Sequence, residues 1–460
     1  MDPRTRALLE APIVPTLLRL AAPNVTVMVM QAAVGLIETY FVGKLGTDAL
    51  AGVALVFPLL TVIQMISAGA MGGGILSSVA RALGSSRRDD ANTLAWHAAA
   101  IAVGLGILTT AAALLGGPKL YALMGGRDGS LAAALTYSNL VFLGAIPLWL
   151  YNSLAAVIRG TGNMLVPASV TVLGAIVLLP LSPALIFGIG PLPRLGVAGG
   201  AAAVVAFYTV GSVIFATYLW TGRGVLKPSL RPPALAWAPT RDILRVGAVS
   251  SLVSITTNVS IGTATGLAGA FGPAAVAGYG TGARLEYLLV PLVFGLGAPL
   301  AAMVGTAIGA GRRERAIRVA WIGALVASVL TETIGLAAAV FPQAWLSLFS
   351  DDPTMNAVGA HYLHVVGPFY GFFGMGLALY FASQGAGRLG WPLLAAVLRM
   401  ALATGGGWLA VQALGLTGLF LALGLAMAEF GLLTAIAIAA GAWFSGVKER
   451  VAPARVAQPS

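Results

Sequence analysis

The stretch PNVTVMVMQAAVGLIETYFVGKLG, Pro23 to Gly46, sets the organisation of the rest of the chain. It is long and apolar enough to form most of a membrane-spanning helix and the turn after it. Pro23 removes a backbone donor near one end, so we expect the helix to bend there. Glu38 places a carboxylate near the other end, and an ionisable group in a span usually faces a cavity or a partner.

Three polar residues of this stretch, Asn24, Gln31 and Glu38, recur at a spacing of one heptad. Residues at that spacing lie nearly above one another on a helix, so their side chains share one stripe. One interpretation is a seam whose polar groups bond neighbouring helices. The other, which we favour, is a stripe that lines a water-accessible path.

The composition identifies an integral membrane protein. The chain has 460 residues, of which 58% are hydrophobic and only 9% are charged, whereas soluble domains are about a quarter charged. The net charge of +11 comes from short loops beside apolar runs, which indicates membrane topology and not nucleic-acid binding. The chain has no cysteine, so disulfides, thiol catalysis and thiolate metal sites are excluded.

Apolar runs of spanning length recur along the whole chain and predict an all-α fold with twelve transmembrane helices. The predicted spans are 14–42, 50–80, 93–116, 131–158, 164–188, 196–220, 242–270, 279–308, 316–341, 355–383, 391–413 and 416–444. An even number of spans places both termini on one side. Most arginines and lysines fall in the loops on that side, so we expect cytoplasmic termini in a multi-pass protein of the cell inner (plasma) membrane.

The longest polar connection, TGRGVLKPSLRPPALAWAPTR at 221–241, divides the spans six and six. The chain is therefore predicted to consist of four parts: an N-terminal lobe at 1–220, a cytoplasmic linker at 221–241, a C-terminal lobe at 242–444 and a cytoplasmic tail at 445–460.

The two halves repeat one another in sequence. Three pairs of segments match in order and at a nearly constant offset: GKLGTDALAG (43–52) with GAFGPAAVAGYG (269–280), ARALGSSRRDDA (80–91) with GTAIGAGRRERA (305–316), and RGTGNMLVP (159–167) with QGAGRLGWP (384–392). Six spans return the chain to its starting side, so the repeats are parallel and related by an axis along the membrane normal. Two pseudo-symmetric six-helix lobes with a cleft between them suit alternating access.

At these residues the chain resembles the multidrug and toxic compound extrusion (MATE) family over essentially its whole length. The resemblance is carried by Pro23, IETYFVGKLGTDALAG (37–52), ALG with RR (82–88), IRGTGN (158–163), LIFGIGPLPRLGVAGGA (185–201), TGARLEYLLVP (281–291) and the GTAIGAGRRERA segment. It implies twelve helices in two lobes around a V-shaped central cleft. It also implies export of organic, often cationic, compounds in exchange for protons or sodium ions.

Some positions depart from the family pattern. The family usually has aspartate where this chain has Glu38. One branch carries an asparagine and an aspartate four apart in the fifth helix, and the matching positions here are Leu178 and Ser182. The paired-carboxylate version of that site therefore cannot operate in this chain. Acidic residues that some members carry in the seventh helix are also missing, and the polar candidate there is Asn258.

We therefore expect Glu38 to bind the coupling cation, H⁺ or Na⁺, and Pro23 to let the first helix bend. The candidates for substrate binding are Asn24, Gln31, Glu38, Asn152, Asn258 and Glu286. Glu286 lies either at the headgroup level or in a cavity. Because it has a predicted depth similar to that of Glu38, the two carboxylates are hypothesised to face each other across the lobes and attract cations.

Other ionisable residues inside spans have open roles. Glu332 and Glu429 are either functional or structural partners of Arg399, the arginine placed well inside a span. His361 and His364 are one turn apart, but no third ligand is visible, so a metal site is not expected. No phosphate-binding loop is present, so ATP is not implied.

The function that follows is secondary active efflux of organic cations, without a cofactor other than the coupling ion, by a monomer in the bilayer. The chain is not expected to be an enzyme, because no nucleophile–base set or close acid pair has convincing spacing. The alternatives are a flippase for lipid-linked oligosaccharides, which needs a more basic cavity, and a channel, which has no need of two lobes.

Overall fold

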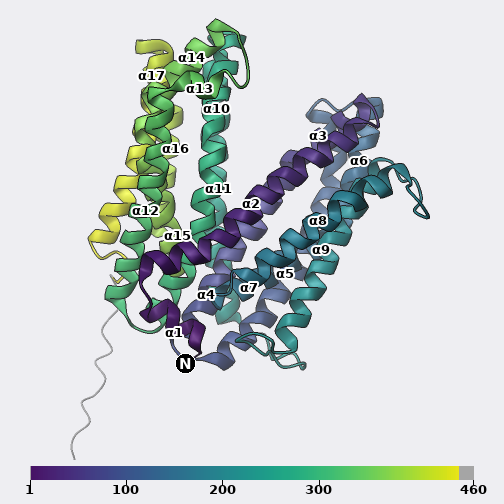
Figure 1. Ribbon diagram of the computed structural model, residues 1–460, viewed down its shortest axis with the longest axis vertical. Coiled ribbons are helices and arrows are strands. Elements are labelled where there is room, and N and C mark those ends of the chain that lie inside the picture. Colours follow the sequence, from purple (N-terminus) through teal and green to yellow (C-terminus); the bar gives the residue numbers. More distant parts are fainter. Residues whose placement is uncertain (1, 445–460) are drawn as a thin grey trace, which may run out of the picture.

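The computed structural model describes residues 2–444, without the side chains of 32, 36, 287, 288 and 290. The predicted tail at 445–460 lies outside the described residues. Almost the whole described chain is helical. Figure 1 shows two helical bundles that meet near the N-terminus and diverge toward the opposite end, here called the far end.

The first half of the chain supplies one bundle, the N-lobe. Its helices are α1 (Pro3–Glu10), α2 (Ile13–Gly43), α3 (Thr47–Gln64), the π-helical segment η1 (Met65–Met71), α4 (Gly72–Gly84), α5 (Arg88–Leu123), α6 (Asp128–Leu143), α7 (Ala145–Gly160), α8 (Leu165–Phe187) and α9 (Val197–Trp220). The segment α3–η1–α4 forms one long span, and α6 and α7 form a single span bent by 50°.

The second half supplies the C-lobe. Its helices are α10 (Trp237–Gly269), α11 (Pro273–Gly309), α12 (Arg313–Val340), α13 (Pro342–Leu346), α14 (Pro353–Val366), the 3₁₀ turn η2 (Gly367–Phe369), α15 (Tyr370–Ala386), α16 (Gly390–Ala401), the π-helical segment η3 (Leu402–Gly406) and α17 (Gly407–Ala439). Since α10 begins at Trp237, the last residues of the predicted linker are helical.

The described residues contain twelve spans. Ten helices are long and apolar enough to cross a membrane, and the bent α6–α7 pair is the eleventh span. One of the ten, Gly390–Ala439, has 50 residues, far more than the roughly 20 that a bilayer needs. Inside it, Gly415 has non-helical φ and ψ angles, and a methyl group on Gly418 would lie 2.1 Å from the carbonyl oxygen of Ala410. This close approach shows that the chain reverses direction at Gly415. This segment therefore holds two spans, and the predicted count is confirmed.

The repeat seen in the sequence recurs in the backbone. Gly46 precedes α3 with φ 116° and ψ 171°, and Gly272 precedes α11 with φ 96° and ψ 173°. Gly196 and Gly415 share another conformation, with φ and ψ of 57° and −134° and of 59° and −140°. These positive φ values disfavour residues with a side chain, so glycine is needed at the same turns of both halves. Two pseudo-symmetric six-helix lobes are thus confirmed.

The linker is bound along the N-lobe. The backbone N–H of Lys227 donates to Asn92 Oδ1 at 2.9 Å, and Trp96 Nε1 donates to the carbonyl of Ser229, also at 2.9 Å. The buried ring of His97 accepts a hydrogen bond from the N–H of Ala236 at 3.1 Å and contacts the carbonyl of Thr93. His97 is therefore a structural anchor for the linker.

The lobes touch through glycines near the N-terminal end. A methyl group on Gly84 of α4 would lie 2.1 Å from the carbonyl oxygen of Thr306 on α11, and a methyl group on Gly309 of α11 would lie 2.1 Å from that of Arg81 on α4. The two contacts exchange the roles of the lobes, as a pseudo-twofold axis requires. Arg81 also pairs with Asp242 of α10 at 2.6 Å.

Helix α2 belongs to both lobes. Near its start, Leu17 and Ala21 are buried in the main hydrophobic core of the C-lobe. At its end, Val42 packs in a small cluster of the N-lobe with Ala49 and Ile186. The helix is unbroken across Pro23. Because its two ends are held by different lobes, a change in the packing of one end acts on the relation between the lobes.

We predict that Gly309→Ala destabilises the protein by about 1–3 kcal/mol, because the added methyl group forces two backbones apart. The measurement is the thermal unfolding midpoint of the purified protein in detergent. Gly104→Ala is the matched control, since a methyl group there meets nothing within 4 Å on α5. Equal midpoints for the two variants would contradict close contact between the lobes.

Candidate functional site

The Glu38 side chain points into the N-lobe. A methyl carbon placed on the Cα of Gly200 in α9 would lie 3.7 Å from each of three groups: Glu38 Oε1, the Tyr137 ring and the Ile186 side chain. The carboxylate also interacts electrostatically with Tyr208. Its Oε1 is buried and has no hydrogen-bond partner among the described residues. A buried polar atom without a partner is costly, so Glu38 is a candidate for binding a proton or a metal cation.

A polar network lies behind this carboxylate. Tyr208 of α9 donates to Gln64 Oε1 at 3.2 Å, and Asn152 of α7 donates to the same oxygen at 3.5 Å. Asn152 also donates to Ser67 Oγ at 2.9 Å. Asn152 is buried, so its amide organises this network inside the N-lobe.

The network ends at the contact between the lobes. Ser67 lies in η1, the π-helical part of the second span, and π segments often occur at functional sites. In the same segment, the carbonyl of Gly69 accepts a hydrogen bond from Gln384 of α15 at 3.4 Å. Gln384 also donates to Ser250 of α10 at 2.9 Å. A series of polar contacts therefore connects the surroundings of Glu38 with the C-lobe.

The C-lobe has its own buried polar cluster. Tyr362 of α14 donates a short hydrogen bond to Glu286 of α11. The Arg399 guanidinium lies 5.3 Å from the ring centroid of Phe430, as a cation–π pair, and interacts with Glu286 and Glu429. Both carboxylate oxygens of Glu429 are buried without a hydrogen-bond partner among the described residues. Arg399 is thus close to Glu429, as expected from the sequence if Arg399 is its structural partner.

The predicted stripe on α2 does not share one environment. Asn24 is buried and donates to the carbonyl of Gly295 in the C-lobe at 3.3 Å, whereas Glu38 faces the N-lobe. Gln31 lies between them and is exposed. Heptad spacing places the three residues on one face but does not include the tilt of the helix, which carries that face from one lobe to the other.

The remaining sequence candidates are dispersed. Asn258 is exposed and bonds the carbonyl of Ser254 on its own helix. Glu38 and Glu286 have their contacts in different lobes, so the structure does not show the two carboxylates facing each other. Leu178 and Ser182 are both buried in α8, and the Ser182 hydroxyl has no partner within residues 2–444.

Glu332 and His361 have local partners. Glu332 accepts a hydrogen bond from the N–H of Gly371 at 2.6 Å, at the start of α15 where the 3₁₀ turn frees backbone donors. His361 contacts Thr417 Oγ1 at 3.0 Å. Within the described part of the chain, no three His, Cys, Asp or Glu residues are grouped as a metal site.

Sequence reasoning missed the tyrosines beside the two carboxylates. Tyr137 adjoins Glu38, and Tyr362 binds Glu286. The two tyrosines are separated by the same number of residues as Gly160 and Gly385, so they occupy equivalent places in the repeat. An alignment of the two halves of the sequence would have identified these two tyrosines as an equivalent pair.

The fold and this site define a multi-pass membrane transporter with two lobes and a buried carboxylate in the first lobe. The MatE family model matches residues 23–184 and 250–409. The chain belongs to this family, the multidrug and toxic compound extrusion transporters, and is not an enzyme.

The relatives cover most of the chain. An FAD transporter of Shewanella oneidensis is 29% identical over 382 residues, which are 82% of each protein. A probable multidrug resistance protein NorM of Deinococcus radiodurans is 30% identical over 355 residues, 72% of each. Another NorM, from Thermotoga maritima, is 26% identical over 381 residues, 82% of this chain and 81% of its own.

Solved structures agree in fold. Crystal structures of a MATE protein in straight and bent conformations both have a TM-score of 0.85 to this chain, at 23% and 24% identity. They cover 96% of this chain and 99% and 98% of their own chains.

Glu332 is predicted to be structural, since it satisfies a backbone donor at a helix start. Glu332→Leu should destabilise the protein by about 1–3 kcal/mol, because the N–H of Gly371 loses its acceptor. Glu332→Gln keeps an acceptor oxygen and should unfold near the original temperature. Thermal unfolding in detergent distinguishes the two, and an equally large loss in both variants would show that the negative charge itself is required.

Proposed function

We propose that the chain exports organic compounds in exchange for H⁺ or Na⁺, and that Glu38 binds the coupling cation. The observation that carries this proposal is the buried Glu38 oxygen without a hydrogen-bond partner among the described residues. A charged carboxylate in such a place costs several kcal/mol, and binding of a cation removes most of that cost.

The position of Glu38 on α2 supports a mechanical role. When Glu38 is neutralised, its side chain fits among Tyr137, Ile186 and Gly200 in the N-lobe. When it is ionised, that end of α2 favours water, while the other end stays in the C-lobe core. Cation binding therefore favours one arrangement of the lobes over another, which is the requirement for coupled transport. Pro23, inside α2, weakens the helix between the two ends and permits it to bend.

We propose that the end where the lobes meet faces the cytoplasm. The lobes meet at the N-terminal end, which carries the arginine-rich loops around Arg87 and Arg312. The positive-inside rule places this end in the cytoplasm. The observed arrangement, with the lobes apart at the far end, is then the outward-facing one, in a monomer of the inner membrane.

Cationic organic compounds are the proposed substrates. The carboxylates Glu38, Glu286 and Glu429 lie within spans. Tyr137 lies near Glu38, and Tyr362 binds Glu286. Carboxylates and aromatic faces attract organic cations. Gln31 and Asn258 are exposed and remain proposed substrate contacts, whereas Asn24 and Asn152 are engaged in bonds within the protein.

A second candidate substrate is FAD, since a relative of similar length is named for its transport. FAD carries a pyrophosphate and needs cationic partners, and Arg399 is the cation in the C-lobe cluster. The relatives reported above are named for drugs or FAD, which does not favour the oligosaccharide flippase.

The proposal predicts that Glu38→Gln lowers the initial rate of cation efflux by roughly 5-fold to 150-fold, the range of typical coupling energies. Glu38→Asp should keep much of the activity, because the carboxylate is retained. The measurement uses purified protein in liposomes and a fluorescent organic cation, with a proton gradient or a sodium gradient imposed separately. The gradient that drives transport identifies the coupling ion.

Glu332→Gln is the matched control, since it removes a carboxylate of another span. Undiminished efflux by Glu38→Gln would exclude Glu38 as the coupling site. An equal loss in Glu38→Gln and Glu332→Gln would also contradict the specific role of Glu38. Parallel assays with FAD decide the substrate class, and transport of FAD without transport of the cation would overturn the cationic assignment.

A further inference from the structure

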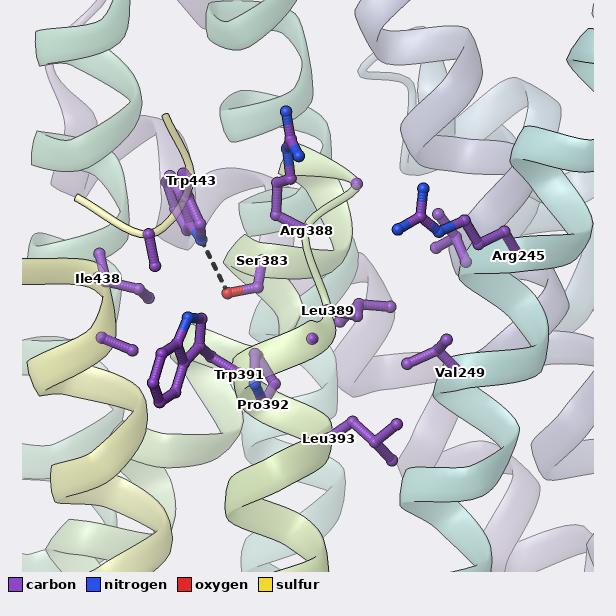
Figure 2. A pocket seen from close by; sticks show the side chains of 15 residues that line it. Arg245, Val249, Ser383, Arg388, Leu389, Trp391, Pro392, Leu393, Ile438 and Trp443 are labelled. Carbon is purple, nitrogen blue, oxygen red and sulfur yellow. Dashed lines mark hydrogen bonds between the residues drawn. The ribbon is translucent and has the colours of Figure 1, made fainter. Parts of the chain in front are cut away.

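A cavity of about 230 Å³ lies in the C-lobe, near the N-terminal end. Its walls come from α10, from the turn between α15 and α16, and from the end of α17. Figure 2 shows Arg245 on the α10 side and Arg388 at the α15–α16 turn, with Trp391 and Trp443 toward α17. The cavity is separate from the surroundings of Glu38, which lie in the other lobe.

Two cations at this cavity have no acidic partner within residues 2–444. Arg245 and Arg388 are exposed, and neither guanidinium forms an ion pair or a side-chain hydrogen bond among the described residues. Asp242 lies one turn before Arg245 on α10, but its carboxylate binds Arg81 at 2.6 Å and Ser78 at 3.0 Å. The positive charge on the cavity is therefore available to an anion.

The rest of the lining is apolar and aromatic. Trp443 is buried and donates through Nε1 to Ser383 Oγ at 3.1 Å, whereas Trp391 is 46% exposed. Tryptophan side chains gather where a membrane protein meets the lipid headgroups. Below Trp391 on the same face of α16, Leu394 and Leu398 are 43% and 40% exposed and continue the apolar surface along the helix.

We propose that this cavity binds the headgroup of an anionic phospholipid, with its phosphate between Arg245 and Arg388 and its acyl chains along Leu394 and Leu398. Basic pockets between spanning helices are a known setting for such headgroups. The volume is below the roughly 300 Å³ at which pockets for drug-sized ligands begin. A free phosphate ion has no use for the apolar surface, which favours a lipid as the source of the anion.

The bound lipid links α10 to α16 at the N-terminal end of the C-lobe. Helix α10 also contacts the N-lobe, where Gly247 packs against Met71 of η1. An anionic lipid in this cavity therefore braces the helix against which the N-lobe rests.

The test uses the full chain in nanodiscs that contain phosphatidylcholine and an equal mole fraction of either brominated phosphatidylglycerol or brominated phosphatidylcholine. Bromine quenches nearby tryptophan, and the Trp391 signal is the difference between the chain and its Trp391→Phe variant. We expect the anionic lipid to quench Trp391 at least about threefold more strongly than the zwitterionic lipid. The Arg245→Gln/Arg388→Gln double variant should abolish this preference.

Arg241→Gln is the control, since Arg241 is an exposed arginine of α10 that does not line the cavity. It should keep the preference for the anionic lipid. Equal quenching by both lipids in the unmodified chain, or an unchanged preference in the double variant, would overturn the proposal. Removal of the preference by millimolar inorganic phosphate would overturn the lipid assignment in favour of a free anion.

Discussion

The packing of α2 into both lobes is the constraint that underlies the proposed transport mechanism. One face of its first half packs on the C-lobe, where Leu17 and Ala21 belong to the core, and its last turn packs on the N-lobe through Val42. Glu38 lies just before that last turn, with its carboxylate near Gly200, Tyr137 and Ile186 of the N-lobe. One helix therefore carries a chargeable group in one lobe while it is anchored in the other.

The contact between the lobes brings their helices into close approach. Gly84 and Gly309 bring backbone against backbone, and the Arg81–Asp242 pair is partly exposed. Around these glycines, Met71 packs against Gly247, and Arg81 also donates to the carbonyl of Gly385 at 3.0 Å. The π segment η1 lies at this contact and joins it to the polar network behind Glu38. Such an interface is suited to two lobes that change their relative position.

The sequence predicted the number of spans, the division into two halves and the repeat, because apolar length and turn glycines are local signals. It could not place side chains in space. Asn24 and Glu38 share a helical face, yet the tilt of α2 puts them in different lobes. Gln64 and Tyr208 were missed because their bond joins residues far apart in the chain. Glu332 was ambiguous in the sequence, since its backbone partner exists only where η2 interrupts the tenth span.

In the proposed mechanism, the charge state of Glu38 sets the arrangement of the lobes. The chain has no cysteine, so spin labels can be introduced at Leu123→Cys and Leu348→Cys, at exposed sites on the far end of each lobe. The measurement is the distance distribution between the two labels in nanodiscs at acidic and at mildly alkaline pH, and with and without sodium. We expect one of these changes to shift the distribution, and Glu38→Gln to lock it in the form seen for the neutralised carboxylate. A shift of the same size in Glu38→Gln would contradict this mechanism.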